Sequence, residues 1–226
     1  MKKLVVLTGA GISAESGLKT FRDSDGLWNG HRIEEVATPE AWERQPSKVL
    51  EFYNERRRGL LEALPNEAHK ALVSLEEHFD VQIITQNVDD LHERAGSKNV
   101  LHLHGELLKM RSTGDPELVY EILDDISLGQ LAEDGDQLRP DIVWFGEPVP
   151  RIEEAAEIVS SADLFVIIGT SLQVYPAAGL IHLLKSNEVP VFVIDRDIPL
   201  IAQQQGFICI QKNAVSGVAE LISLIV

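Results

Sequence analysis

The sequence contains little cysteine, no long apolar run and few basic residues. Its single cysteine, Cys209, excludes an intrachain disulfide, which fits a reducing compartment, and we expect a cytoplasmic location. No segment approaches the roughly 18 consecutive apolar residues of a membrane helix, so we expect no membrane association. The chain has 20 lysines and arginines against 36 aspartates and glutamates, a net charge of −16. That balance argues against nucleic acid as a partner, because binding phosphates needs concentrated positive charge.

The composition is that of a globular chain with one core. The 226 residues are 44% hydrophobic and 25% charged, enough for a sizeable core and a smaller lobe but not for a second full domain. Met1-Lys2-Lys3 and the apolar residues after it briefly resemble a signal peptide, but the run ends after four residues, at Thr8. The sequence does not specify the oligomeric state, and a monomer is compatible with it.

The N-terminal segment predicts a buried strand followed by a glycine turn. Leu4 to Leu7 is a short apolar run, and Gly9-Ala10-Gly11 follows it directly. We expect Gly9 to allow a sharp turn, Gly11 to let a pyrophosphate approach the backbone, and small Ala14 to let a following helix pack on the strand. The phosphates would lie at the N-terminus of that helix. A tight turn that binds no ligand is the alternative.

The rest of the chain alternates between strands and helices, which predicts an α/β fold with a doubly wound parallel, Rossmann-like sheet. In an ordinary dinucleotide fold an acidic strand end comes about 20 residues after the glycines. Here the next strand begins only at Val81, so we expect a smaller inserted lobe. The expected strands after the first are Val81–Thr85, Val100–His104, Ile142–Phe145, Leu164–Ile168 and Val191–Ile194. The expected helices begin at Thr38-Pro39, Pro46, Asn66, Asp90, Ile152, Ala177 and Val215.

We therefore expect a single catalytic domain over residues 1–226. Its Rossmann-like core would comprise approximately 1–22, 79–105 and 140–226, and the small lobe approximately 30–78 and 106–139. The acidic stretch from Arg111 to Arg139 predicts some helix.

Polar residues that carry chemistry follow two of the expected strands. Gln86-Asn87-Val88-Asp89 comes after the strand that begins at Val81, where side chains point into the ligand crevice of a parallel sheet. His102 and His104 are two residues apart in an extended segment, so they face opposite sides and do not easily share a site. His104 is the candidate base, and an ordinary core histidine is the alternative. Asp89 is a candidate ligand-binding residue or only the N-cap of the next helix.

Six motifs in this order resemble those of the sirtuins, the NAD-dependent protein-lysine deacylases. They are the glycine loop continuing through Thr20-Phe21-Arg22 to Trp28, the Gln86 to Asp89 segment, His104-Gly105-Glu106, Phe145-Gly146-Glu147, Gly169-Thr170-Ser171 and the segment at Asp195. The resemblance implies that the acyl-lysine carbonyl oxygen attacks the ribose carbon that carries nicotinamide, with His104 as general base. An imidazole titrating near neutrality suits that role. Asn87 and Asp89 would hold the ribose and the nicotinamide amide, Phe21 would exclude water and Arg22 would contact phosphate or ribose.

The resemblance also implies which residues bind NAD and which bind acylated lysine side chains of proteins. Asp195 stands where sirtuins usually carry Asn, and it still offers acceptors to the adenosine ribose. The implied NAD-binding residues are Gly9, Ala10, Gly11, Ile12, Glu15, Thr20, Phe21, Arg22, Trp28, Gln86, Asn87, Val88, Asp89, Gly169, Thr170, Ser171, Asp195, Arg196, Asp197 and Ala214. The implied substrate-binding residues are Ala37, Tyr53, Arg56, Val143, Phe145, Gly146, Glu147, Val174 and Tyr175, where the peptide would pair as an added strand. A core strand is the alternative for Val143 to Glu147.

One usual sirtuin element is missing. Sirtuins usually carry two Cys-x-x-Cys pairs that bind a structural zinc, between the segments that here contain His104 and Phe145. This chain has no cysteine or histidine between Glu106 and Phe145, and Ser112 stands about where the first thiolate would be. We therefore expect no zinc, and we expect the apolar residues from Leu118 to Leu131 to pack the lobe in its place.

The acyl group is predicted from a pair of residues on one expected helix. Tyr53 and Arg56 are three positions apart and therefore share a face. Such a pair resembles the sirtuins that prefer succinyl-, malonyl- or glutaryl-lysine, and small Ala37 matches the residue that leaves room for the longer chain. A solvated basic face formed by Arg56 to Arg58 is the alternative. The alternative functions are plain deacetylation, mono-ADP-ribosyl transfer and a non-catalytic NAD-binding module.

Overall fold

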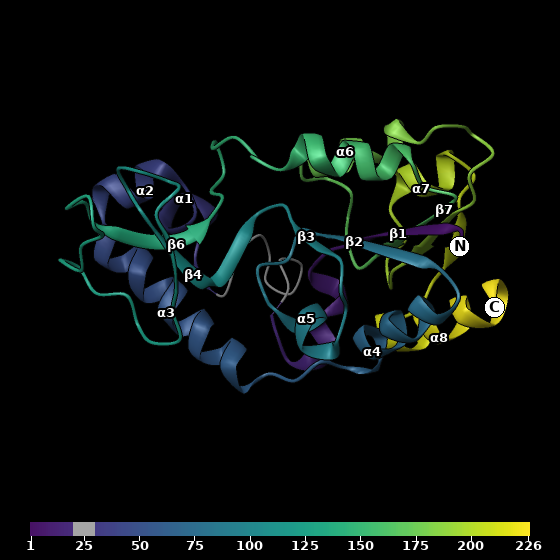
Figure 1. Cartoon of the computed structure of the whole chain (residues 1–226), viewed down its shortest axis with the longest axis horizontal. Helices are drawn as coiled ribbons and strands as arrows, with labels where there is room; N and C mark the ends of the chain where they lie inside the picture. Colours follow the sequence, from purple (N-terminus) through teal and green to yellow (C-terminus); the bar gives the residue numbers. More distant parts are fainter. Residues whose placement is uncertain (20–29) are drawn as a thin grey trace.

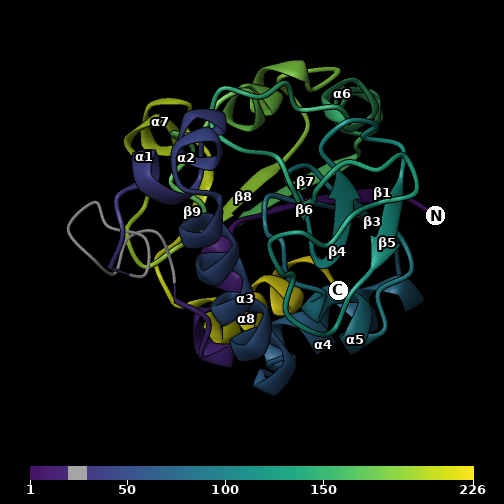
Figure 2. The ribbon, with the colours of Figure 1, turned by 90° about the vertical axis from the view of Figure 1, so that its left-hand side faces the viewer.

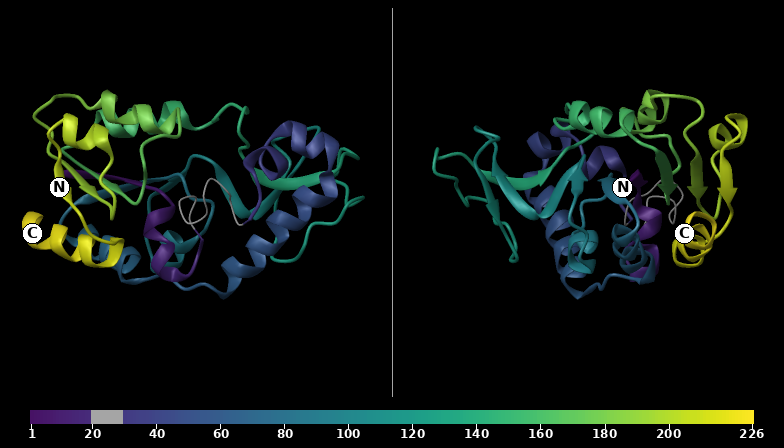
Figure 3. Two further views of the ribbon diagram at one scale, coloured as in Figure 1. Left: turned by 180° about the vertical axis from the view of Figure 1, so that it is seen from behind. Right: turned by 45° about the vertical axis from the view of Figure 1, so that its right-hand side comes forward.

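A computed structural model describes residues 1–19 and 30–226. The molecule has two parts, a parallel sheet with helices on both faces and a smaller lobe of helices and antiparallel strands (Figure 1). Both termini lie at the end of the molecule away from the lobe, as the view from behind also shows (Figure 3). Within the described ranges, no helix is long and apolar enough to cross a membrane.

The larger sheet has six parallel strands in the order β3-β2-β1-β7-β8-β9. Their bounds are Lys3–Thr8 for β1, Asp80–Thr85 for β2, Val100–His102 for β3, Leu164–Ile168 for β7, Val191–Ile194 for β8 and Ile208–Ile210 for β9. This confirms the expected doubly wound sheet. The chain order reverses between β1 and β7, which is where parallel sheets of this kind form a ligand crevice.

Alternate residues of the strands pack on opposite faces of this sheet, as the period of two requires. Val5 and Leu7 belong to one core, and Leu4 and Val6 belong to the other. The first face is covered by α6 (Ile152–Ser160), α7 (Leu200–Gln204) and a 3-10 helix, Ala177–Leu183. The second is covered by α4 (Glu67–Ser74), followed by a 3-10 turn at Leu75–Glu77, and by α8 (Ala214–Ile225).

Within residues 30–226, the lobe combines three helices with a three-stranded antiparallel sheet in the order β5-β4-β6. The helices are α1 (Ile33–Val36), α2 (Pro39–Arg44) and α3 (Pro46–Glu62), and the strands are β4 (Gly105–Ser112), β5 (Val119–Glu121) and β6 (Leu138–Ile142). The long helix α3 packs against β4 and β6 (Figure 2). The short helix α5 (Leu91–Ala95) follows β2.

Local sequence signals explain where several helices begin. The Thr38 hydroxyl accepts a hydrogen bond from Ala41 N, and Pro39 occupies the first turn of α2. Asn66 caps α4 in a reciprocal capping box with His69. Asn213 caps α8.

Two expectations about the lobe are wrong. Ile142–Phe145 is not a strand of the parallel sheet, because Ile142 ends β6 and the residues after it form a loop. The stretch from Arg111 to Arg139 contains no helix in the structure, but turns around β5. A short apolar run does not reveal its partner strand, and the acidic stretch lacks a sustained helical period.

Candidate functional site

The glycine loop after β1 packs against the loop after β7. Gly11 N donates to Gly169 O at 2.9 Å, and a Cβ on Gly11 would lie 2.5 Å from Gly169 Cα. A Cβ on Gly9 would lie 2.7 Å from Gly169 O. Gly9 has an extended backbone with φ of −128°, so glycine is needed there for close packing and not for the turn expected from sequence. Glycine at position 11 is likewise required by its close contact with the backbone of Gly169.

The helix expected after the glycines is absent. Two short 3-10 helices, Ala10–Ile12 and Ala14–Ser16, stand in its place. The expectation that phosphates lie at the N-terminus of a full helix is therefore wrong. The side chain of Ile12 is buried in the core that contains Leu4 and Val6, and Ile12 does not line the cavity described next.

A cavity of about 1180 Å³ opens at the carboxyl ends of β1, β2, β7 and β8 and extends to α3. It brings together nearly all the candidate residues that the structure describes. Those lining it are Gly9, Ala10, Gly11, Glu15, Gln86, Asn87, Val88, Asp89, His104, Gly169, Thr170, Ser171, Asp195, Arg196, Asp197 and Ala214, with Ala37, Tyr53, Arg56, Val143, Phe145, Gly146, Glu147, Val174 and Tyr175. The candidates Thr20, Phe21, Arg22 and Trp28 lie outside the described residues.

His104 faces the cavity from the segment between β3 and β4. Its Nδ1 lies 3.0 Å from Gln86 O, and a carbonyl oxygen only accepts, so Nδ1 carries the proton and donates. In the neutral ring Nε2 is then the acceptor. Burial lowers the pKa of His104, and the hydrogen bond to Gln86 opposes that shift. The imidazole is therefore neutral at pH 7 and able to take a proton at Nε2.

Asn87 and Asp89 are joined through a serine that the sequence analysis missed. Asn87 Nδ2 donates to Ser13 Oγ at 3.2 Å, and Ser13 Oγ donates to Asp89 Oδ2 at 3.0 Å. Asp89 Oδ1 also accepts from Leu91 N, but the N-cap of α5 is Asp90, so the alternative that Asp89 is only the N-cap of the next helix is wrong. Burial raises the pKa of Asp89, while its two hydrogen bonds lower it. Ser13 belongs to the glycine loop, but the pattern of that loop does not show that its hydroxyl links the two residues.

Other candidates for cofactor binding are fixed by polar contacts. Gln86 Nε2 donates to Thr170 Oγ1 at 3.1 Å, which ties the ends of β2 and β7 together. Asp195, at the end of β8, is buried and accepts from Asp197 N at 2.9 Å. The Glu15 carboxylate accepts from Asn213 Nδ2 and Val215 N, both at 2.9 Å. Glu15 therefore holds the N-terminus of α8 against the glycine loop.

The three consecutive arginines of α3 point into three different environments. Arg58 is exposed and forms ion pairs with Glu51 and Asp125. Arg57 is fully buried. Arg56 lines the cavity together with Tyr53, so the solvated basic face describes only Arg58. Burial lowers the pKa of Arg56 to about 10, and the charges of Tyr53 and Asp89 act in the opposite direction.

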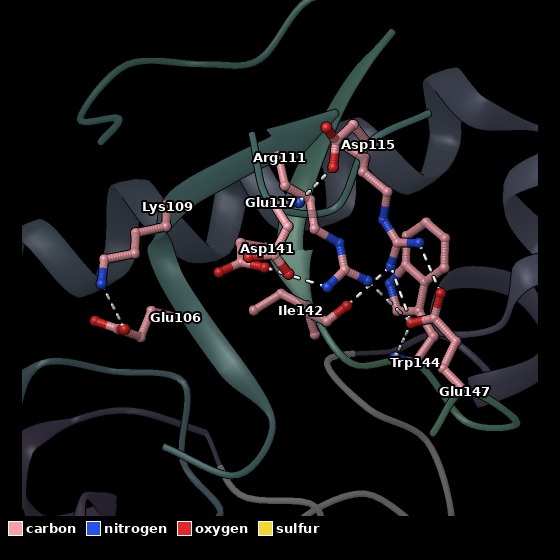
Figure 4. A network of polar contacts seen from close by, with 10 residues as sticks. Glu106, Lys109, Arg111, Asp115, Glu117, Asp141, Ile142, Trp144 and Glu147 are labelled. Atoms are coloured by element: carbon pink, nitrogen blue, oxygen red, sulfur yellow. Dashed lines mark hydrogen bonds and ion pairs between the residues drawn. The ribbon is translucent and has the colours of Figure 1, made fainter. Parts of the chain in front are cut away.

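A salt-bridge cluster holds the segment from Trp144 to Glu147 (Figure 4). Arg139 binds both carboxylate oxygens of Glu147, at 2.7 and 3.1 Å, and stacks 3.2 Å from the Trp144 ring centroid. Glu147 also accepts from Trp144 N at 2.7 Å, and Arg111 approaches it at 3.6 Å. Phe145 is left 42% exposed on the cavity wall, and its N donates to Ala37 O. The cluster fixes the backbone that we expect to pair with substrate.

Polar contacts hold the lobe where sirtuins usually carry zinc. Ser112 Oγ donates to Asp134 at 2.6 Å and accepts from the backbone N–H groups of Gly114 and Asp115. Asn54 of α3 bonds both the N–H and the carbonyl of Ile126, at 2.9 and 3.0 Å. Among the residues the structure describes, no three or more His, Cys, Asp or Glu side chains are placed to hold a metal.

The expected apolar packing of the lobe is only partly right. Ile126 is buried with Leu50, Met110 and Leu138. Leu123, Leu128 and Leu131 are instead 57 to 64% exposed. The segment from Leu118 to Leu131 is therefore held against α3 by polar as well as apolar contacts.

Comparison with known proteins agrees with this geometry. Residues 9–176 match the Sir2 family. The chain is 58% identical over 221 residues to an NAD-dependent protein deacylase of Helicobacter pylori, covering 98% of this chain and 96% of the relative. It is 51% identical over 232 residues to an NAD-dependent protein deacylase of Bacteroides thetaiotaomicron, covering 100% and 99%.

Solved structures show the same fold. A complex of a Sir2 homologue with NAD superposes with a TM-score of 0.88 at 41% identity, covering 99% of this chain and 89% of that one. A Sir2 protein with a deacetylated p53 peptide and 3'-O-acetyl ADP ribose superposes with a TM-score of 0.85 at 30% identity, covering 98% and 92%. The parallel sheet and the cavity at its carboxyl edge define a nucleotide-binding α/β protein. The chain belongs to the Sir2 family.

Proposed function

We propose that this member of the Sir2 family is an NAD-dependent protein-lysine deacylase that prefers acyl groups ending in a carboxylate, such as succinyl and malonyl. Acetyl removal is a second activity of the same pocket. The observation that carries the preference is the position of Arg56, which lines the cavity together with Tyr53.

The chain is an NAD-dependent protein deacylase, as are the relatives to which it is 51 to 58% identical over almost its whole length. Its residues fit the cofactor. The cavity lies at the carboxyl edge of the sheet, where the strand order reverses, and a buried acidic residue, Asp195, directly follows β8. NAD supplies the ribose carbon that accepts the acyl oxygen, with nicotinamide as the leaving group.

The polar residues of the cavity have separable roles in this proposal. Asn87, Ser13 and Asp89 form one hydrogen-bonded chain, which presents an amide and a carboxyl group to the nicotinamide and its ribose. His104 is neutral and takes a proton at Nε2, since Nδ1 is occupied by Gln86 O. Glu15 and the paired loops at Gly11 and Gly169 shape the crevice without themselves reacting.

Several apolar residues line the cavity together with Tyr53 and Arg56. Ala37, Leu60 and Leu107 line it, and all three are buried. Burial disfavours the charged guanidinium, as the lowered pKa of Arg56 shows, so an acyl carboxylate that enters the pocket offsets this cost. Charge-assisted hydrogen bonds of this type contribute roughly 1.5–3 kcal/mol each. An acetyl group gains nothing from them.

The test compares Arg56→Met with Arg58→Met, steady-state kinetics being measured with succinyl and acetyl forms of one peptide. Both substitutions remove one arginine from the same helix, but Arg58 is exposed and does not line the cavity. We expect Arg56→Met to raise the KM for the succinyl peptide at least tenfold and to leave acetyl turnover little changed. Arg58→Met should change neither the KM for the succinyl peptide nor the turnover of the acetyl peptide. An equal response of both substrates to Arg56→Met would show that Arg56 supports the fold or the cofactor instead.

A further inference from the structure

His102 is a buried charged residue that the roles above do not use. It ends β3, the edge strand beside β2, and is 7% exposed. Its Nδ1 lies 3.1 Å from Asn87 O, and its Nε2 lies 2.8 Å from Glu93 Oε1 of α5. The sequence predicts only that this histidine and His104 face opposite sides of an extended segment.

The two partners of His102 fix its protonation. A carbonyl oxygen and an ionised carboxylate both only accept hydrogen bonds, so both ring nitrogens carry protons and the ring is an imidazolium. Burial alone would lower the pKa of His102, but the hydrogen bond and charge of Glu93 outweigh it, and the charge of Glu106 adds to them, so that the pKa is raised. The charge of His102 in turn lowers the pKa of Asp89 and of His92, and the charge of Lys109 lowers that of Glu93.

His102 and His104 hold two consecutive carbonyl groups. His104 Nδ1 donates to Gln86 O, and His102 Nδ1 donates to Asn87 O. The side chain of Asn87 leaves this clamped backbone and reaches Ser13 in the cavity. A bond from a cation to a backbone carbonyl is stronger than one from a neutral donor, so the bond from His102 is well suited to holding this position.

We propose that His102 is a positioning residue that fixes the backbone of Asn87 and thereby the orientation of its amide in the cofactor crevice. It does not touch the reacting atoms. The proposal rests on the NAD-dependent deacylase activity and is independent of the preference for acidic acyl groups. The alternative is a purely structural role for His102. In that case the His102–Glu93 ion pair stabilises the packing of α5, and any loss of activity follows from loss of stability.

Two amide substitutions separate these roles, because each preserves one ring nitrogen. The Nδ2 of asparagine occupies about the place of histidine Nδ1, and the Nε2 of glutamine about that of histidine Nε2. His102→Asn therefore keeps the donor to Asn87 and loses Glu93, while His102→Gln keeps Glu93 and loses the donor to Asn87. Both variants lose the positive charge, so each is a control for the other.

The experiment measures nicotinamide release with NAD and an acyl peptide that wild type turns over, together with thermal unfolding. We expect the kcat of His102→Asn to stay within threefold of wild type and that of His102→Gln to fall at least tenfold. The KM for the acyl peptide should change less than twofold in both. Equal kcat values in the two variants, or kcat losses that follow the order of their unfolding temperatures, would overturn the proposal. Failure of the deacylase assignment itself is distinguishable, because wild type would then release no nicotinamide.

Discussion

Replacing Arg57 by methionine should destabilise the attachment of the acidic segment from Arg111 to Arg139 to α3. Arg57 is fully buried, and its guanidinium donates to Asn54 Oδ1 at 2.8 Å, Leu107 O at 2.9 Å and Asp124 O at 3.3 Å. Methionine fills part of the same space but offers no donor. The substitution therefore leaves two buried acceptors, Asn54 Oδ1 and Leu107 O, and one part-buried acceptor, Asp124 O, short of one partner each.

The expected magnitude is a difference of two opposing effects. Three hydrogen bonds from a charged group contribute roughly 5–9 kcal/mol in total. Burial lowers the pKa of Arg57 from 12.5 to about 10, which corresponds to a cost of roughly 3 kcal/mol for keeping it charged. The free energy of unfolding should therefore fall by about 2–6 kcal/mol, a decrease in Tm of roughly 4–24 °C for a chain of this size.

Chemical denaturation of the two variants Arg57→Met and Arg58→Met measures this effect. The Arg58 control removes a neighbouring guanidinium whose ion pairs are exposed, so its free energy of unfolding should stay within about 1 kcal/mol of wild type. If Arg57→Met were also within about 0.5 kcal/mol of wild type, the reasoning that polar anchoring holds the lobe would be refuted.

Three further predictions concern the base, the pH dependence and the metal. His104→Ala should lose at least about 100-fold in kcat while keeping its circular dichroism spectrum, and wild-type turnover would remove His104 from the mechanism. Burial lowers the pKa of His69 to about 4 and that of His92 well below its ordinary value, so the unfolded chain binds more protons than the folded one. The stability that these residues contribute is complete above pH 6.5 and is lost as the pH falls toward 4, by roughly 3 kcal/mol for His69. Urea denaturation at a series of pH values from 7.5 to 5 checks this. A free energy of unfolding that stays constant or rises as the pH falls would contradict it. The chain should fold with no stoichiometric zinc by elemental analysis and withstand a chelator, because it has no cysteine or histidine between Glu106 and Phe145 and a bond from Ser112 to Asp134 holds that segment, and unfolding by the chelator would refute this.

The regular part of the fold was predictable because its signals are local. The apolar strands at Leu164–Ile168 and Val191–Ile194 and the helix at Ile152–Ser160 have the predicted bounds. The convergence of His104 and Asn87 on one cavity was predictable as well, because parallel strands end at the same edge of a sheet.

The rest depends on contacts between distant residues. The partner strand of Ile142 is set by pairing with Gly105, which no local pattern encodes. Arg56 lines the cavity, Arg57 is buried and Arg58 is exposed because different segments pack against each side of α3. The contact of Gly11 with Gly169 joins residues 158 positions apart. The sequence alone could therefore explain Gly11 only by the close approach of a ligand, and not by this contact.

The preference for an acidic acyl group is tested most directly on the wild-type protein. One peptide sequence carrying either succinyl-lysine or acetyl-lysine is incubated with NAD, and kcat/KM is measured from nicotinamide release while mass spectrometry identifies the acyl-ADP-ribose formed. The account predicts a kcat/KM at least tenfold higher for the succinyl peptide, arising mainly from a lower KM, with O-succinyl-ADP-ribose as the product. Equal values for the two peptides, or a higher value for the acetyl peptide, would contradict it.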